Sequence, residues 1–518
     1  MNSLCFGICK FLKKYARIIL MTNLGYTPEE PIAAIATALA PAALGIVRAS
    51  GKNCVELVSK IFSRPKALLE SGGNSIVYGW IVDGGAKIDE VLVSVFRAPK
   101  SFTGEEMCEI SCHGGVNVVQ AIYNVLLKNG FRQAERGEFT FRAYINGKTD
   151  LTRAEAIREI IDSKTNAGRS RAAGRLAGNL FETIDKIKKL VVDTLASIEV
   201  GIEYPEDEET IADSYDATDL KKASFELSAL ASSWNSEKIY QDGARVVLCG
   251  RTNAGKSSLF NALLKEERAI VSDIEGTTRD FIESWIDFDG VPARLFDTAG
   301  LRETSDKIEA VGVERTKDLS VEADLILYLV DSSCGIENCL NDEDKNFIKS
   351  ALENKKPLIL VFNKCDKIIG NENGAESFDA DKVSSSDFPF LKDFFYSENS
   401  NSDSKDSNVG NQNSFVCVKI AAKKGLGLGS LSSAVKNILM KASESDRTQT
   451  GLGSERQKEA VVQALECVNH ALSLAKDYAL DAVVQDLEDC LDYLGEVTGE
   501  VTPDDVLGSI FSRFCVGK

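Results

Sequence analysis

Residues 250–257, which read GRTNAGKS, constrain the fold of this chain more than any other segment. They follow an apolar run typical of a β-strand and precede an apolar helix start, which is the context that a phosphate-binding loop requires. Small residues let backbone N–H groups point at phosphate oxygens, and the helix N-terminus adds positive potential. We expect Lys256 to reach the β- and γ-phosphates of a nucleotide and the Ser257 hydroxyl to bind Mg²⁺.

Three further motifs follow in the order of a guanine-nucleotide site. Residues 297–300 (DTAG) end a strand with a carboxylate for Mg²⁺ and a glycine for the γ-phosphate, and residues 276–280 (GTTRD) contain a switch threonine. Residues 363–366 (NKCD) end another strand, where Asp366 can accept two hydrogen bonds from the N1–H and 2-amino groups of guanine. Adenine leaves this carboxylate unpaired at a cost on the order of 1–3 kcal/mol, so the motif selects GTP over ATP.

The loop at residues 421–423 (AAK) is expected to pack on the base, with Ala421 in place of the usual serine. Ras-like enzymes place a water-orienting glutamine directly after the glycine of the DTAG motif. Leu301 stands there and cannot orient water, so another residue must do so. The predicted GTP contacts are Asn253, Ala254, Gly255, Lys256 (also catalytic), Ser257, Ser258, Ser272, Asp273, Ile274, Glu275, Gly276, Thr277, Thr278, Asp297, Thr298, Ala299, Gly300, Asn363, Lys364, Cys365, Asp366, Ala421, Ala422 and Lys423.

Short apolar runs around these motifs predict the strands of a doubly wound parallel sheet, because they alternate with helical stretches. The predicted strands span 244–249, 281–288, 293–296, 325–330, 358–362 and 415–420. Residues 396–414 are rich in Ser, Asn and Asp and are predicted to form a disordered surface insertion.

Apolar residues recur at helical spacing on both sides of this segment, which predicts two helical blocks packed on each other. The recurring positions are Leu176, Leu180, Ile184, Ile187, Val191, Leu195 and Ile198, then Val461, Leu465, Val468 and Leu472, then Leu480, Val484, Leu487, Leu491 and Leu494. We therefore predict a GTPase domain at 242–440 inserted into a discontinuous helical domain at 146–241 and 441–518.

Residues 30–145 have a mixed α/β pattern, with strands predicted at 76–82 and 91–96 and a helix at 116–129. Residues 1–29 are predicted to be an N-terminal tail, and because Met21 follows, the first twenty residues are either part of that tail or the result of a misplaced start. The chain offers neither a signal peptide nor the roughly 20 apolar residues of a membrane span.

The net charge of −18 argues against a broad basic face for nucleic acid, so any RNA contact is expected to be local, transient or aided by a partner. Thirteen dispersed cysteines and two histidines lack zinc spacing, which favours reduced core thiols and a cytoplasmic protein.

Several motifs in fixed order resemble the tRNA modification GTPases of the MnmE (TrmE) family, within the TrmE-Era-EngA-like class, from about residue 30 onward. They are residues 101–106 (SFTGEE), 137–143 (GEFTFRA), 146–148 (NGK), 154–156 (AEA), the inserted GTPase and 514–518 (FCVGK). The resemblance implies a folate-binding and dimerisation domain at 30–145, the discontinuous helical domain, and the inserted Ras-like GTPase domain.

The resemblance also implies specific ligands. A K⁺ ion replaces an arginine finger, and its ligands correspond to Asn253, Ser272, Ile274 and Thr277; those of Mg²⁺ correspond to Ser257 and Thr278. Glu309 corresponds to the residue that positions water, although a solvated helix carboxylate is its alternative. Tetrahydrofolate, as the 5-formyl or methylene form, corresponds to Arg48, Glu109, Lys148 and Lys518. Cys515 is either a catalytic or redox thiol or a structural neighbour of that pocket.

The implied reaction adds an aminomethyl or carboxymethylaminomethyl group at C5 of the tRNA wobble uridine. It involves a homodimer that pairs two GTPase domains and an FAD-dependent partner of the MnmG (GidA) type in a heterotetramer. Residues 40–44 (APAAL) replace the family's glycine-rich turn, which leaves as one alternative a folate-binding scaffold that has lost RNA chemistry. A second alternative is a ribosome-assembly GTPase switch of the related double-threonine class.

Overall fold

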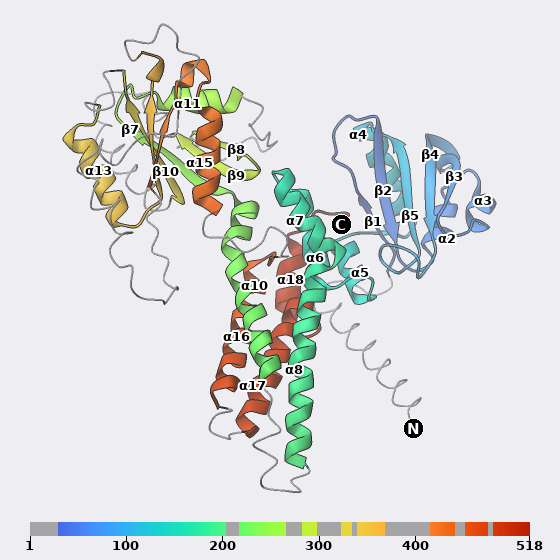
Figure 1. The fold of residues 1–518 in the computed structure, drawn as a ribbon. Coiled ribbons are helices and arrows are strands. Elements are labelled where there is room, and N and C mark those ends of the chain that lie inside the picture. The colour runs from blue at the N-terminus through green and yellow to red at the C-terminus, as the bar shows by residue number, and fades with distance from the viewer. Residues whose placement is uncertain are drawn as a thin grey trace. The chain divides into compact units, whose positions relative to one another are not determined.

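The computed structural model describes residues 30–203, 217–265, 282–297, 323–333, 339–367, 415–440, 451–474 and 480–518 (Figure 1). The chain divides into two compact units. The first comprises Met1–Arg158, Gly174–Ser228 and Glu459–Lys518, and the second comprises Glu159–Ala173 and Ala229–Lys458. The tail predicted at 1–29 and the insertion predicted at 396–414 lie outside the described residues.

The first unit begins with a six-stranded sheet in the order β3-β4-β5-β2-β1-β6. Its strands and the helices connected to them are β1 (Ile32–Ile35), β2 (Leu44–Ser50), α2 (Cys54–Ser59), α3 (Pro65–Leu69), β3 (Ser75–Asp83), β4 (Ala86–Phe96), β5 (Met107–His113), α4 (Val116–Lys128), β6 (Arg132–Gln133) and α5 (Glu138–Ile145). The strands and the helix predicted from local pattern in this region are confirmed as β3, β4 and α4.

One face of this sheet is buried and the other carries exposed side chains. Val47, Val93 and Ile110 belong to a core that also contains residues of α2 and α4. Since side chains alternate along a strand, the residues between them point to the opposite face. There Arg48 of β2 lies opposite Glu109 of β5 in the antiparallel register. The alternation therefore brings these two charged side chains together on the exposed face.

The helices described in the rest of the molecule outside the GTPase sheet are α6 (Leu151–Asp162), α7 (Asn166–Ala177), α8 (Asn179–Glu203), α10 (Thr218–Asp242), α16 (Glu455–Leu474), α17 (Leu480–Thr498) and α18 (Asp504–Ser512). The predicted packing of sequence-distant stripes is confirmed, because α8 packs along α17 (Figure 1). Leu180, Ile184, Ile187 and Val191 of α8 are fully buried.

The predicted stripe is nevertheless not continuous, and its first position was wrong. Gly178 has a φ of 111° and separates α7 from α8, while Leu176 before it is 38% exposed. A glycine in the left-handed region ends a helix. The apolar residues at helical spacing therefore continue across the boundary between α7 and α8 and do not belong to a single helix. On α17, Val483, Cys490 and Val497 are buried in addition to the predicted Leu487 and Leu494, so the buried face lies about one position from the predicted one.

The second unit contains a six-stranded sheet in the order β12-β11-β10-β7-β9-β8. Its elements are β7 (Ala244–Gly250), α11 (Lys256–Leu263), β8 (Ile282–Phe288), β9 (Val291–Asp297), β10 (Leu325–Asp331), α13 (Asp342–Glu353), β11 (Leu358–Asn363), η2 (Cys365–Lys367), β12 (Phe415–Lys419), η6 (Ala422–Lys424) and α15 (Leu428–Met440). All six predicted strands are confirmed.

Five of these strands are parallel, and β8 pairs antiparallel with β9 at the edge. Residues of α11 and α15 share one core with alternate side chains of the sheet, and residues of α13 share a second core with the others. Helices on both faces of a mostly parallel sheet make this the predicted doubly wound fold. Among the described helices, none combines the length and apolar composition needed to cross a membrane.

Candidate functional site

The phosphate loop joins β7 to α11 through three residues with positive φ: 129° at Gly250, 62° at Asn253 and 100° at Gly255. A Cβ on Gly255 would clash with the carboxamide of Asn363, so glycine is required there both for its φ and for space. The ammonium of Lys256 donates to the carbonyl oxygens of Gly250 and Arg251, at 2.7 and 2.9 Å. These bonds hold the lysine over the loop into which the phosphates are expected to enter.

Asn363, at the end of β11, connects the three predicted nucleotide loops. Its Nδ2 donates to the carbonyl oxygen of Ala254 at 2.9 Å, and its Oδ1 accepts from the backbone N–H groups of Lys364 at 2.8 Å and Ala422 at 3.1 Å. Asn363, Ala254 and Ala422 are all buried. A single carboxamide therefore fixes the phosphate loop against both loops predicted to hold the base.

Lys364 adds a second connection to the phosphate loop. Its Nζ donates to the carbonyl oxygen of Asn253 at 2.7 Å and to Oδ2 of Asp331 at 2.5 Å. Burial alone would raise the pKa of Asp331, but hydrogen bonds from Lys364 and Ser333 outweigh it and lower that pKa from 3.8 to about 2. Asp331 is not among the residues predicted from sequence, although its position directly after the apolar run at 325–330 is a signal that could have indicated it.

The remaining predicted nucleotide contacts are only partly described. The carboxylate of Asp366 lies 3.3 Å from Nζ of Lys424, and buried Asp297 ends β9 next to β7. Ser257 and Ser258 lie in the first turn of α11, Ala421 is the N-cap of η6, and Lys423 lies within η6. Residues outside the described ranges are Ser272, Asp273, Ile274, Glu275, Gly276, Thr277, Thr278, Thr298, Ala299, Gly300 and Glu309.

Away from the nucleotide loops, Arg48 is the centre of a second charged site. Its Nε and Nη2 donate to Oε1 of Glu109 at 2.9 and 2.7 Å, and its Nη1 donates to the carbonyl oxygen of Gly517 at 3.1 Å. The guanidinium also contacts two aromatic rings, with its carbon 5.4 Å from the centroid of Phe102 and 5.6 Å from that of Phe139. Sequence reasoning identified the charged pair but missed both rings and the backbone carbonyl.

The C-terminal segment completes this site. Arg136 and Val516 form an antiparallel bridge, and the N–H of Phe139 donates to the carbonyl oxygen of Lys518 at 3.2 Å. Burial and the positive charge of Arg48 lower the pKa of Lys518, while Glu109 acts in the opposite direction. The structure thus brings Arg48, Glu109 and Lys518 together, although they are far apart in the sequence.

The other two residues proposed for this site have different surroundings. Lys148 donates from Nζ to the carbonyl oxygen of Pro99 at 3.1 Å, and its side chain lies next to Gly104. Cys515 is exposed, and its carbonyl oxygen accepts from the N–H of Lys518 at 3.3 Å. Neither of these contacts brings the side chain of Lys148 or that of Cys515 against Arg48.

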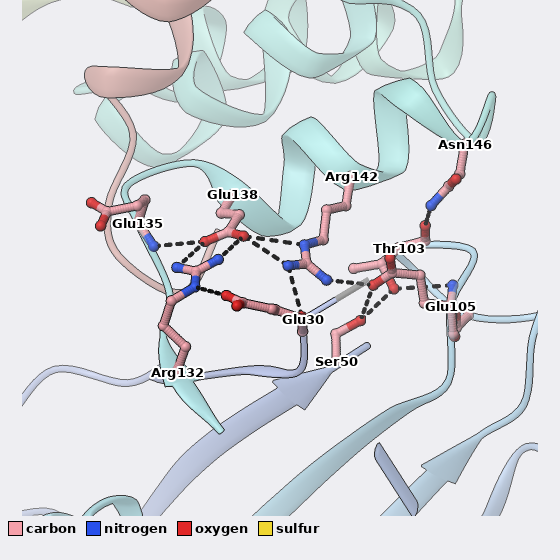
Figure 2. A network of polar contacts seen from close by, with 10 residues as sticks. Glu30, Ser50, Thr103, Glu105, Arg132, Glu135, Glu138, Arg142 and Asn146 are labelled. Carbon is pink, nitrogen blue, oxygen red and sulfur yellow. Dashed lines mark hydrogen bonds and ion pairs between the residues drawn. The ribbon is translucent and has the colours of Figure 1, made fainter. Parts of the chain in front are cut away.

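A buried polar network lies beside this second site (Figure 2). The side chain of Arg142 is fully buried and donates to Glu138 at 2.8 Å from Nη2 and to Glu105 at 3.0 Å from Nη1. Glu138 also accepts from Arg132 at 2.7 Å, and Glu105 accepts from the Ser50 hydroxyl at 3.1 Å. This network connects the GEFTFRA and SFTGEE motifs, because Arg142 of the first motif binds Glu105 of the second.

Comparison with known proteins agrees with this geometry. A family model described as "GTP-binding protein TrmE N-terminus" matches residues 31–148, and one described as "MnmE helical domain" matches residues 151–515. The tRNA modification GTPase MnmE of Treponema denticola is 48% identical over 95% of this chain and 99% of its own length. Those of Treponema pallidum (strain Nichols) and Borrelia turicatae are 40% and 39% identical, over 95% and 96% of this chain and 99% and 100% of their own lengths.

The doubly wound sheet, the phosphate loop and the guanine-selective motif define a P-loop GTPase, a hydrolase acting on GTP. The chain belongs to the MnmE family of tRNA modification GTPases. This membership supports a GTPase that binds GTP and acts in tRNA modification, rather than a ribosome-assembly switch.

Proposed function

We propose that this GTPase hydrolyses GTP in a K⁺-dependent reaction and thereby supports the addition of a carboxymethylaminomethyl group to C5 of the tRNA wobble uridine in the cytoplasm. The observation that carries the proposal is the presence, on one chain, of a guanine-nucleotide site and a separate charged site closed by the C-terminus. Hydrolysis alone needs only the first site. The second site therefore supports participation in the modification chemistry itself.

Asn253 and Ser257 support the proposed metal sites. Both residues are exposed at the phosphate loop, and their side chains offer the oxygen ligands that hard cations prefer. K⁺ would be held by Asn253 with Ser272, Ile274 and Thr277, and Mg²⁺ by Ser257 with Thr278. A cation beside the phosphates neutralises the charge that develops during transfer, as an arginine finger does. Glu309 would position the attacking water, with Lys256 on the phosphates.

The charge balance of the second site suits a tetrahydrofolate, whose glutamate moiety carries carboxylates. Burial lowers the pKa of the Lys518 ammonium, and repulsion by the Arg48 guanidinium lowers it further, while Glu109 acts in the opposite direction. A bound carboxylate would relieve this repulsion, and Glu109 can accept from N–H groups of a pterin. The 5-formyl or methylene form would supply one carbon, with Lys148 at the rim and Cys515 nearby.

An FAD-dependent partner of the MnmG type, in a heterotetramer, would supply the redox chemistry and much of the tRNA-binding surface. The net charge of −18 supports this division, because an acidic chain holds RNA poorly by itself.

The exposed sheet face of the first unit supports a homodimer. Ile76, Tyr78 and Leu92 are 66%, 48% and 47% exposed, and Tyr78 lies opposite Leu92 in the register. Ile76 belongs to the same cross-strand row as Arg48 and Glu109, so this apolar face continues to the charged site. Large exposed apolar patches mark interaction surfaces, and a second copy would cover this one.

Chromatography with light scattering tests the homodimer. We expect wild type to be dimeric and Leu92→Glu to be monomeric at the same concentration. Phe225→Glu is the matched control, because Phe225 is 76% exposed but lies on α10. A dimeric Leu92→Glu variant would contradict the proposed interface.

GTP hydrolysis in K⁺ and in Na⁺ at equal ionic strength tests the catalytic proposal. We expect strong stimulation by K⁺ in wild type and none in Asn253→Ala. Equal rates in the two salts would mean that Asn253 holds no catalytic cation.

A further inference from the structure

We infer that Arg142 and Glu105 are positioning residues for the Arg48 site: their ion pair aligns the two aromatic rings that flank the Arg48 guanidinium. The inference rests on the proposed function of this site in binding a folate. It assigns a role to two motif residues that contact neither Lys518 nor Glu109 in the described contacts.

Each ring is carried by a different segment. Phe102 lies in the loop between β4 and β5, whereas Phe139 lies in the first turn of α5. The loop and the helix are not neighbours in the sequence, so their relative position depends on contacts between side chains. Arg142 of α5 supplies the charged contact, because its guanidinium binds Glu105 of the loop as well as Glu138 at the start of its own helix (Figure 2).

The loop end of this connection is fixed at several points. Glu105 accepts from Ser50, which also shares a 2.7 Å hydrogen bond with the buried hydroxyl of Thr103. Ser50 lies two residues after Arg48 on β2, so both side chains are on the same side of the strand. The backbone carbonyl of Thr103 accepts from Nδ2 of Asn146 at 2.7 Å. The loop that carries Phe102 is therefore fastened directly beside Arg48.

The helix end is equally constrained. Glu138 is fully buried, and its pair with Arg142 lies within α5 itself. Its pair with Arg132 of β6 connects the helix to the sheet, so a shift of α5 would break that ion pair. Phe139 follows it directly and donates its backbone N–H to the last residue of the chain. Since buried charges tolerate little displacement, Arg142 sets the spacing of the two rings around the Arg48 guanidinium.

This arrangement also determines what a ligand meets. Glu109 and the Gly517 carbonyl accept three hydrogen bonds from Arg48, which leaves one N–H on each of Nη1 and Nη2 for a ligand beside the two rings. Phe102 is 36% exposed, so part of this ring is accessible beside the charged groups. A flat heterocycle with a carboxylate tail is the chemical class that such a ring and a cationic pair would accept.

The test compares Glu105→Gln with Glu106→Gln in the full-length chain. Both glutamates are partly exposed and each binds one arginine, but Glu106 binds Arg97 rather than Arg142. The affinity for 5-formyltetrahydrofolate is measured by calorimetry, and the ring at position 102 is followed by fluorine NMR with 4-fluorophenylalanine. Thermal unfolding reports whether the first unit, which contains both glutamates, is folded, and GTP hydrolysis in the absence of folate reports on the second unit.

We expect Glu105→Gln to weaken folate binding about tenfold and to broaden or shift the fluorine signal, because the loop loses its charge-assisted anchor. Glu106→Gln should change neither, and both variants should hydrolyse GTP at the wild-type rate. Unchanged affinity and an unchanged signal in Glu105→Gln would overturn the inference. A wild-type chain that does not bind folate would instead refute the proposed function, while the fluorine signal would still decide whether Glu105 positions the ring.

Discussion

Replacing Asn363 by alanine is expected to separate the phosphate loop from the base-binding loops. The change removes the donor to the Ala254 carbonyl and the acceptor for the Ala422 N–H, both of which are buried. An unsatisfied buried polar group costs about 1–3 kcal/mol. Two such groups give about 2–6 kcal/mol, and the lower half of this range applies if water enters the gap left by the side chain.

Part of this cost falls on nucleotide binding, because the unpaired loops lose their relative position. We expect the affinity for a fluorescent GDP analogue to fall by roughly 30-fold or more, which corresponds to about 2 kcal/mol. Asn363→Asp keeps the acceptor but loses the donor, so it should weaken binding as well. Asn354→Ala, which removes an exposed contact to the Ser350 carbonyl, should bind normally. Affinity within twofold of wild type for Asn363→Ala would refute the reasoning.

Three further substitutions test other parts of the nucleotide site. Asp366→Asn should shift preference from GTP to xanthosine triphosphate, because an amide donor suits the 2-carbonyl of xanthine; unchanged preference in a competition assay would contradict guanine recognition by Asp366. Gly255→Ala should abolish nucleotide binding, because its φ is 100° and the added Cβ would clash with Asn363, whereas Gly429→Ala meets no atom within 4 Å and should bind normally. Asp331 has a folded pKa of about 2 against an ordinary value of 3.8, so its stabilising contribution is complete above the ordinary value and is lost as the pH falls through the folded one. Unfolding temperatures measured from about pH 4 to about pH 2 should therefore fall less in Asp331→Asn than in wild type, and parallel curves would show that Asp331 contributes nothing there.

The nucleotide site could be predicted from sequence because each of its parts is local. The phosphate loop and the guanine motif are contiguous segments at strand ends, and parallel strands bring their carboxyl ends to one edge of the sheet. The pairing that Asn363 makes with Ala254 was not predictable, because it depends on how two loops from different strands pack. The position of Asp331 at the end of an apolar strand was a local signal, but its role depends on Lys364, which follows the neighbouring strand β11.

The second site shows the opposite case. The order of motifs indicated Arg48, Glu109 and Lys518, but nothing local indicates that Gly517 reaches Arg48 across most of the chain. The rings of Phe102 and Phe139 were missed because aromatic residues in apolar surroundings are usually core residues. The error at Leu176 has a local cause: Gly178 marks a helix end, but the apolar period continues across it.

The central claim is that one chain uses a nucleotide site and a separate charged site for a single modification of tRNA. Nucleoside analysis of tRNA tests it most directly, in a strain that lacks this chain and is supplied with wild type, Lys256→Ala or Glu109→Ala. Immunoblotting confirms equal amounts of the three proteins. We predict that only wild type restores the modified wobble uridine, and full restoration by either variant would contradict the claim.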